Sequence, residues 1–125
     1  MIVCDTSIWI EYFRGRDPFF SNVSNLIENG SILGIECIFG ELLQGVKSKV
    51  ERKLVLECWE YLPKYSDAGL WLDAGEFSAI QGLSQKGVGL IDAAIAIAVL
   101  KSNSQLWTLD KKLGTLLPGR HRYTA

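Results

Sequence analysis

The sequence predicts one α/β domain, an α/β/α sandwich with a central, mostly parallel sheet. Short apolar runs that are typical of strands alternate with longer stretches of helical periodicity, which is the pattern of parallel sheets covered by helices on both faces. The chain has 125 residues, with 48% hydrophobic and 22% charged residues, as in an ordinary globular domain. We therefore expect a single domain over residues 1–125 that needs no disulfide or structural metal to fold.

The first half of the chain predicts two strands and four helices. Polar residues 5–7 separate an apolar run from a helical pattern and can cap that helix. Pro18 can begin a second helix, Gly30 helps to stop it, and Pro63 ends a later one. We expect strands at residues 2–4 and 31–35, and helices at residues 8–13, 18–28, 36–46 and 50–62.

The second half predicts a long amphipathic stretch, then a helix that is apolar on nearly every side. Such a helix, starting around Asp92, must be buried in the core. We see no repeats, linkers or low-complexity segments. The expected elements are an amphipathic stretch at residues 70–85, the apolar helix at 90–100, a strand at 105–109, a short helix at 112–117 and an edge strand at 122–124.

The charges nearly balance but are unevenly distributed. Thirteen Lys and Arg against fourteen Asp and Glu give a net charge of -1, which argues against a protein that binds mainly by covering phosphates with cations. Residues 1–46 hold six acids and two bases, whereas four bases and no acid follow Asp110. This distribution leaves room for an acidic pocket beside a basic rim, with solvated surface charge as the alternative.

The three cysteines are typical of a reduced compartment. Cys4, Cys37 and Cys58 are odd in number, widely spaced and set among apolar neighbours, so we expect small core residues rather than disulfides or metal ligands. No basic segment precedes an apolar one at the N-terminus, and the longest apolar run, residues 93–100, is too short to span a bilayer. We expect a cytoplasmic protein without membrane contact.

Three acids stand where parallel sheets bind their ligands. Asp5 follows the first strand and Asp110 follows the strand at residues 105–109, so both should lie at carboxyl ends of strands. Asp92 begins the apolar helix, where an uncompensated charge would cost several kcal/mol. Each acid has an alternative role at a helix N-terminus, where backbone N–H groups and the helix dipole favour a carboxylate.

Glu41 is a fourth candidate, because it lies between Ile38 and Leu42 on the apolar side of its helix; a surface position is the alternative. Acids that converge on one crevice repel one another unless a cation neutralises them. Four carboxylates would form an all-oxygen site, which suits Mg²⁺ or Mn²⁺ rather than zinc. No nucleophilic triad competes, since the only histidine, His121, stands in the basic tail.

The candidate acids lie in four segments: residues 1–10 (MIVCDTSIWI), 40–45 (GELLQG), 89–98 (GLIDAAIAIA) and 107–112 (WTLDKK). These segments resemble the four signature blocks of PIN-domain ribonucleases. Their order and spacing, together with the chain length, are similar to those of the small VapC-type toxins of bacterial and archaeal toxin–antitoxin pairs. The resemblance covers nearly the whole chain, and four blocks in register are specific although each block alone is weak.

The resemblance implies a PIN-like fold and a metal-dependent endoribonuclease. Asp5 and Asp92 would be the principal ligands of one or two Mg²⁺ or Mn²⁺ ions. Glu41 would be a ligand or a base that orients water, and Asp110 a water-mediated or second-ion ligand. The fourth block continues Lys-Lys-Leu where many relatives have a further acid and a phenylalanine, so the role of Asp110 is the least defined. Ser7 and Thr108 match supporting polar positions of the family.

The implied partners are an RNA substrate, a cognate antitoxin protein and a second copy of the chain. Arg14 is the first candidate for an RNA contact, with Lys111 and Lys112 after it, and His121 is expected to be solvated or to face RNA. Most early aromatic residues should be core, while a few could anchor a partner. Further candidates for a basic rim are Lys47, Lys49, Arg52, Lys53, Arg120 and Arg122.

Two other classes of protein remain as alternatives. The first is a PIN-like module that has lost catalysis and binds RNA or protein; the complete set of four acids argues against it. The second is a phosphate-handling regulator such as a receiver domain. A receiver needs an acidic pair after the first strand, and Asp5 has no acidic neighbour.

Overall fold

The computed structural model describes all 125 residues and shows a parallel sheet at the centre of the chain. Strand β1 (Ile2–Cys4) pairs in parallel with β2 (Gln105–Trp107), and Val3 lies opposite Leu106. Single parallel bridges extend this pair on both sides, at Ile2–Ile32 and Leu106–Arg122, and a third joins Gly34 to Lys64. The expected mostly parallel sheet is confirmed.

Two of the predicted strands, at residues 31–35 and 122–124, do not form and are replaced by isolated bridges. The segment at residues 31–35 divides its pairing between two neighbours, because Ile32 bridges β1 while Gly34 bridges Lys64. Gly34 also packs so closely on Trp59 that a Cβ atom would lie 2.9 Å from Cζ3 of that ring. At the C-terminus, residues 122–124 make only one bridge, since the preceding turn η2 (Gly119–His121) brings the chain back to β2.

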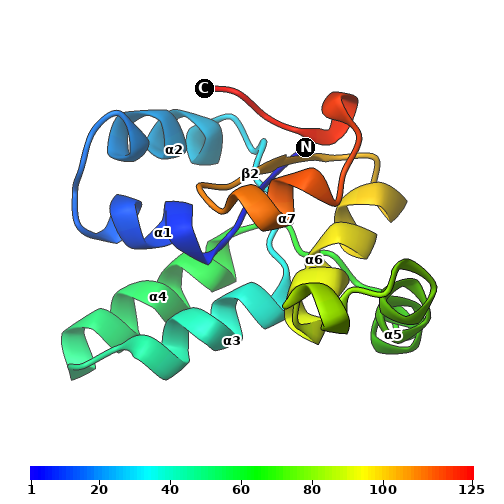
Figure 1. The fold of residues 1–125 in the computed structure, drawn as a ribbon. Helices are drawn as coiled ribbons and strands as arrows, with labels where there is room; N and C mark the ends of the chain where they lie inside the picture. The colour runs from blue at the N-terminus through cyan, green and yellow to red at the C-terminus, as the bar shows by residue number, and fades with distance from the viewer.

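Helices surround the two strands. In Figure 1, α2 lies on one side of the strands and α3 and α4 lie on the other, so the expected α/β architecture is confirmed. None of the helices combines the length and hydrophobicity needed to cross a membrane. The helices are α1 (Thr6–Phe13), α2 (Phe19–Glu28), α3 (Glu36–Gly45), α4 (Lys49–Tyr61), α5 (Leu70–Gln81), α6 (Leu90–Lys101) and α7 (Lys111–Thr115), with a short turn η1 (Ser84–Lys86) before α6.

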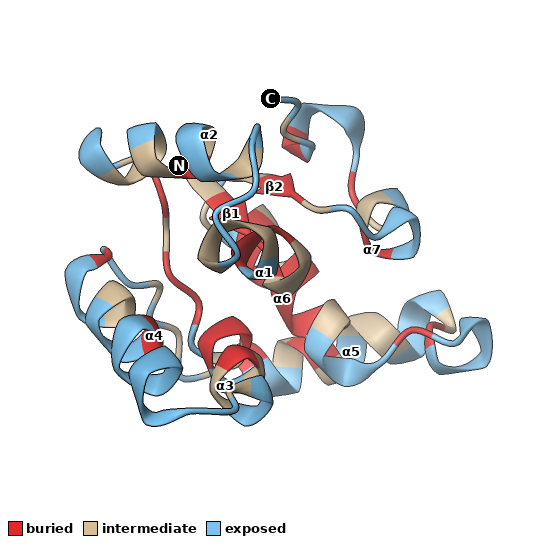
Figure 2. Cartoon of the chain, turned by 90° about the vertical axis from the view of Figure 1, so that its left-hand side faces the viewer, coloured by how far each residue is buried: buried red, intermediate tan, exposed pale blue.

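Helix α6 forms the middle of the core, as its composition predicts. Its alanines at 93, 94, 96 and 98 are fully buried and let neighbouring elements approach closely, and Ile95 and Val99 fill the remaining space. Figure 2 shows the buried residues concentrated on α6 and the two strands. Burial of a side chain such as Ile95 contributes about 1.5–3 kcal/mol to folding, so this core fixes α6 relative to the sheet.

The structure contradicts the prediction for His121 and confirms that for the cysteines. His121 is not solvated: it is 4% exposed, and its Nδ1 lies 2.8 Å from the carbonyl oxygen of Ser104, because η2 folds the tail onto the sheet. The prediction of free cysteines is confirmed. Cys4 is buried, while Cys37 and Cys58 are half-buried, and burial raises the pKa of each of these last two thiols to about 11.

The fold brings several element ends to one edge of the sheet. Since β1 and β2 are parallel, their carboxyl ends lie side by side, with Cys4 opposite Trp107. Asp5 and Thr108 are therefore the first residues beyond the sheet on adjacent strands. Helices α1 and α7 begin at this edge, which places their N-termini next to the residues that follow the strands.

Candidate active site

Asp5 is buried, with 5% of its surface exposed, at the end of β1. Its Oδ1 accepts hydrogen bonds from the Ser7 hydroxyl and from the backbone N–H of Ile8, and its Oδ2 accepts one from the Thr108 hydroxyl. The bond from Ile8 caps helix α1. The capping and functional interpretations of Asp5 are thus compatible, because the same carboxylate serves the helix and still faces the other acids.

Two hydroxyl groups connect Asp5 to the loop after β2. The Ser7 hydroxyl accepts from the backbone N–H of Leu109 at 3.0 Å, and the Thr108 hydroxyl accepts from that of Asp110 at 2.9 Å. Each hydroxyl receives a backbone proton and gives its own proton to Asp5. This arrangement fixes the loop at residues 108–110 against the N-terminus of α1 and leaves Asp5 an acceptor on both oxygens.

Asp110 caps helix α7 at the same edge of the sheet. Its Oδ1 accepts from the backbone N–H groups of Lys112 at 2.9 Å and Leu113 at 3.4 Å. Its Oδ2 makes no hydrogen bond within the chain, and the side chain is exposed. One oxygen of this carboxylate is therefore free for a ligand, although the other serves the helix.

Glu41 reaches the site from helix α3. Its Oε1 accepts a hydrogen bond of 2.9 Å from the hydroxyl of Thr6, in the first turn of α1. The sequence interpretation had not assigned Thr6 a role beyond helix capping. Its position between Asp5 and Ser7 marked it as a neighbour of the site, but the contact with Glu41 depends on how α1 packs against α3.

Asp92 lies in the first turn of α6 and is half-buried. Burial raises the pKa of its carboxyl group, and the charges of Asp110, Glu41 and Asp5 raise it further. No hydrogen bond opposes these effects. Asp92 therefore lies close enough to each of the other three predicted acids to interact with it, and no protein donor stabilises its charge.

Burial and hydrogen bonding change the pKa of Asp5 in opposite directions. Burial raises the pKa of its carboxyl group, while the bonds from Ser7, Thr108 and Ile8 lower it. The net direction is upward, so the hydrogen bonds do not fully compensate for the loss of water. A cation beside Asp5 and Asp92 would favour the charged form of both.

The donor set fits a hard divalent cation. All four groups are carboxylates, which are the oxygen ligands that Mg²⁺ and Mn²⁺ prefer. The structure contains no group of three or more acidic, histidine or cysteine side chains placed so that together they could hold a metal ion. Mg²⁺ does not need one, because it usually keeps several waters and binds through one or two carboxylates. The residues present therefore suit such an ion, held on one side by the protein.

Basic side chains lie on two sides of this acidic edge. Arg14 is exposed and pairs with Glu11 at 3.5 Å, so its charge is partly engaged. Lys111 and Lys112 are exposed on α7, directly after Asp110, and neither forms an ion pair. The three predicted RNA contacts thus lie on two different sides of the site, and only the α7 pair is free of an acidic partner.

Parallel strands, helices on both sides and carboxylates gathered at the strand ends define an α/β domain with an acidic centre. A sequence profile of the PIN domain matches residues 2–116, and the chain belongs to the PIN-domain family. The resemblance seen in the four sequence segments is therefore confirmed.

The fold is similar to a solved structure, the crystal structure of VapBC2 from Rickettsia felis bound to a DNA fragment from their promoter. The TM-score is 0.71 with 25% sequence identity, and the match covers 94% of each chain. This similarity agrees with the expected VapC-type toxin. No curated protein shows significant sequence similarity to the chain.

Proposed function

We propose that the protein is a Mg²⁺- or Mn²⁺-dependent endoribonuclease that hydrolyses RNA phosphodiester bonds and acts as the toxin of a toxin–antitoxin pair. The observation that carries this proposal is the environment of Asp92. Burial raises the pKa of Asp92, three other carboxylates raise it further, and no protein group donates to it, as expected of a cation ligand in a family of nucleases.

The chemistry depends on a divalent ion, which would lower the pKa of a water molecule and stabilise charge on the phosphate oxygens. Asp5 and Asp92 would hold the ion, because they are the two acids whose pKa is raised overall, with burial as the largest cause. Glu41 would orient the attacking water or serve as a further ligand. Asp110 would act through water or on a second ion, with the oxygen that does not cap α7.

The surrounding polar groups keep these carboxylates in place. Ser7 and Thr108 direct their hydroxyl protons at Asp5, and Thr6 occupies Oε1 of Glu41. Glu41 thereby keeps Oε2 for water while its other oxygen is fixed. Positioning of this kind matters because misplacing a reacting group by about 1 Å can reduce the rate about a hundredfold.

An antitoxin would bind next to the acids. A groove of about 400 Å³, here called the α1/α4 groove, is lined by Thr6 and Glu41 and has Ile10, Phe13 and Leu54 among its apolar lining residues. VapBC2 is a complex of toxin and antitoxin, which supports a protein partner for this chain. Action in the cytoplasm would keep the three cysteines reduced.

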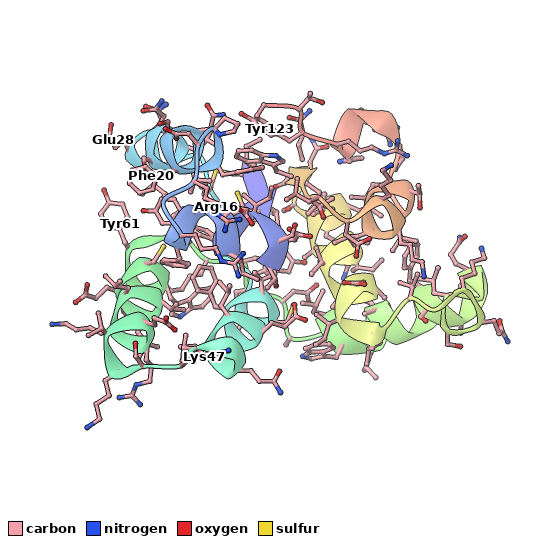
Figure 3. All side chains as sticks on the ribbon, turned by 60° about the vertical axis from the view of Figure 1, so that its left-hand side comes forward. Arg16, Phe20, Glu28, Lys47, Tyr61 and Tyr123 are labelled. Carbon is pink, nitrogen blue, oxygen red and sulfur yellow. The ribbon has the colours of Figure 1, made fainter.

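Two exposed aromatic side chains outside the lining of this groove offer further apolar contacts. Figure 3 shows Phe20 and Tyr61 projecting from α2 and from the end of α4 on one side of the molecule, with Lys47 at the turn between α3 and α4. Phe20 is 44% exposed and Tyr61 is 70% exposed. We assign these two rings, among the aromatics of the chain, as anchors for a partner.

A homodimer is the other proposed assembly. Helix α5 exposes large apolar side chains, and so does the start of α6, on a surface other than the α1/α4 groove. A second copy that covered them would remove apolar surface from water, at about 25 cal/mol per Å². The exposed side chains are Trp71, Leu72, Ile80, Leu90 and Ile91.

The test is cleavage of a mixed cellular RNA pool by purified, antitoxin-free protein with Mg²⁺ or Mn²⁺. Discrete products should appear with the ion, and they should vanish with EDTA and in the Asp92→Asn variant. Cleavage that persists in both controls would contradict the proposed site. Failure to cleave RNA and to bind either ion would instead favour the catalytically inactive binding module.

A further inference from the structure

Two groups of basic side chains differ in their partners, and the five remaining bases, Lys47, Lys49, Arg52, Lys64 and Lys86, are also unpaired but lie elsewhere in the sequence. Those of the first group pair with acids and are largely neutralised: Arg14 and Arg16 with Glu11, Lys53 with Glu57, and Lys101 with Asp67 and Asp73. In contrast, the bases that follow Asp110 form no ion pair, and no acid follows them in the sequence. We call this second set the α7 basic face: Lys111, Lys112, Arg120 and Arg122.

A cleft lies on the α7 basic face, next to the acids. Its volume is about 390 Å³, and it lies between the end of β2, helix α7 and the C-terminal segment. In Figure 1 the C-terminal segment (red) passes above α7 (orange) beside β2. Thr108 and Asp110 line one wall of this α7 cleft, so it adjoins the carboxylate site directly; Lys111 and Arg122 line it as well.

Arg122 is held in a defined position at this cleft. Its Nε donates a 2.9 Å hydrogen bond to the carbonyl oxygen of Leu117, while the rest of the guanidinium has no partner in the chain. Fixing one nitrogen reduces the conformational entropy that the side chain must lose on binding. The remaining N–H groups can then bind an anion in the fork geometry that suits phosphate.

The α7 cleft and the α1/α4 groove differ in the chemistry they offer. Half of the residues that line the α1/α4 groove are hydrophobic, and its two acids, Glu41 and Glu51, are balanced by two bases, Arg14 and Lys47. The α7 cleft has Asp110 as its only acid and a Lys and an Arg as its bases. A peptide with apolar side chains suits the first surface, whereas a strand of phosphates suits the second.

We propose that single-stranded RNA reaches the carboxylates through the α7 cleft, where Lys111 and Arg122 bind phosphates adjacent to the one that is cleaved. This inference rests on the proposed ribonuclease function. It explains how a chain with net charge -1 attracts a polyanion, because the positive charge is local and unpaired. Leu109, which is 52% exposed at the wall of the cleft, offers an apolar contact to a nucleobase or ribose.

The experiment measures binding of a short, fluorescein-labelled single-stranded RNA by anisotropy, in the Asp92→Asn background so that the RNA stays intact. The double variant Lys111→Ala/Arg122→Ala should bind roughly tenfold more weakly at moderate salt. The slope of log affinity against log salt should fall by about 1.4, since each phosphate contact on a single strand contributes about 0.7. Arg122→Lys, which keeps the charge but loses the bond to Leu117 and the fork geometry, should keep the salt slope of the parent while binding roughly two- to threefold more weakly.

The matched control is Lys49→Ala/Arg52→Ala, which removes one Lys and one Arg from α4. Both were candidates for a basic rim in the sequence, but they do not line the α7 cleft, and both are exposed and unpaired. It should leave affinity and salt slope nearly unchanged. Equal weakening by the two double variants, or no weakening by the α7 pair, would overturn the inference while the nuclease proposal stands. If the parent neither binds nor cleaves RNA, the proposed function itself is wrong.

Discussion

Thr6 donates a 2.9 Å hydrogen bond from its hydroxyl to Oε1 of Glu41, and so joins the first turn of α1 to the middle of α3. The two residues are 35 positions apart in the sequence. A glutamate side chain can rotate about three bonds, and the contact with Thr6 restricts this rotation for Glu41. Thr6 is therefore a positioning residue for Glu41.

Replacing Thr6 with valine should lower kcat for RNA cleavage by about ten- to a hundredfold, because Glu41 is no longer fixed. KM for RNA should change little, and the free energy of unfolding should fall by only about 1 kcal/mol. Thr6→Ser restores the hydroxyl and should recover most of kcat. Steady-state kinetics on a labelled RNA measure these changes. A valine variant with the kcat of the parent would show that catalysis does not need the hydrogen bond from Thr6 to Glu41.

The pH dependence of stability should reveal the free-energy cost of keeping Asp92 ionised in the folded protein. Its pKa is raised in the folded state, so its ionised form destabilises the fold above that pKa, and the penalty is relieved as the pH falls through it. Without divalent ions, Asp92→Asn should melt at a higher temperature than the parent near neutral pH. The two melting temperatures should converge in acid, below about pH 4. A variant that is less stable than the parent at neutral pH would contradict this electrostatic description.

Asp67 should behave in the opposite way. The Lys101 ammonium, followed by the Gly69 N–H and the Tyr65 hydroxyl, lowers the pKa of its carboxyl group. Because this pKa is lower in the folded state, the carboxylate stabilises the fold at any pH above its pKa in the unfolded chain. This contribution is lost as the pH falls through the pKa of the folded state. Asp67→Asn should therefore melt slightly below the parent at neutral pH and coincide with it in acid. A melting temperature that stays below that of the parent at every pH would point to lost packing instead.

Divalent ions should stabilise the folded protein by linkage. At a free concentration of about a hundred times Kd, Mg²⁺ or Mn²⁺ should add about 2.7 kcal/mol to the free energy of unfolding. Thermal melts with and without millimolar ion measure the shift, and Asp92→Asn should lose it. An unchanged melting temperature in the parent would count against a cation site at these carboxylates.

Much of this architecture could be predicted from the sequence because the signals were local. Asp5 and Asp110 each follow an apolar run, and parallel strands necessarily bring such residues to one edge. The apolar composition around Asp92 likewise indicated a core helix, and α6 forms the middle of the core. These expectations depended on periodicity and position alone.

The features that were missed depend on contacts between distant elements. The bond between Thr6 and Glu41 requires α1 to pack on α3, which no pattern within either helix indicates. His121 stands in a basic tail, yet the turn η2 buries it against Ser104. The pairing of residues 31–35 is likewise divided by the position of Lys64, far along the chain.

The most direct test of the carboxylate centre is the RNA cleavage rate of four single variants in the presence of Mn²⁺: Asp5→Asn, Glu41→Gln, Asp92→Asn and Asp110→Asn. Asp73→Asn is the control, because Asp73 is an acid that pairs with Lys101 away from the site. We expect Asp5→Asn and Asp92→Asn to abolish cleavage, Glu41→Gln and Asp110→Asn to reduce it strongly, and the control to cleave like the parent. Parent-level cleavage by Asp5→Asn or Asp92→Asn would show that the reaction takes place elsewhere.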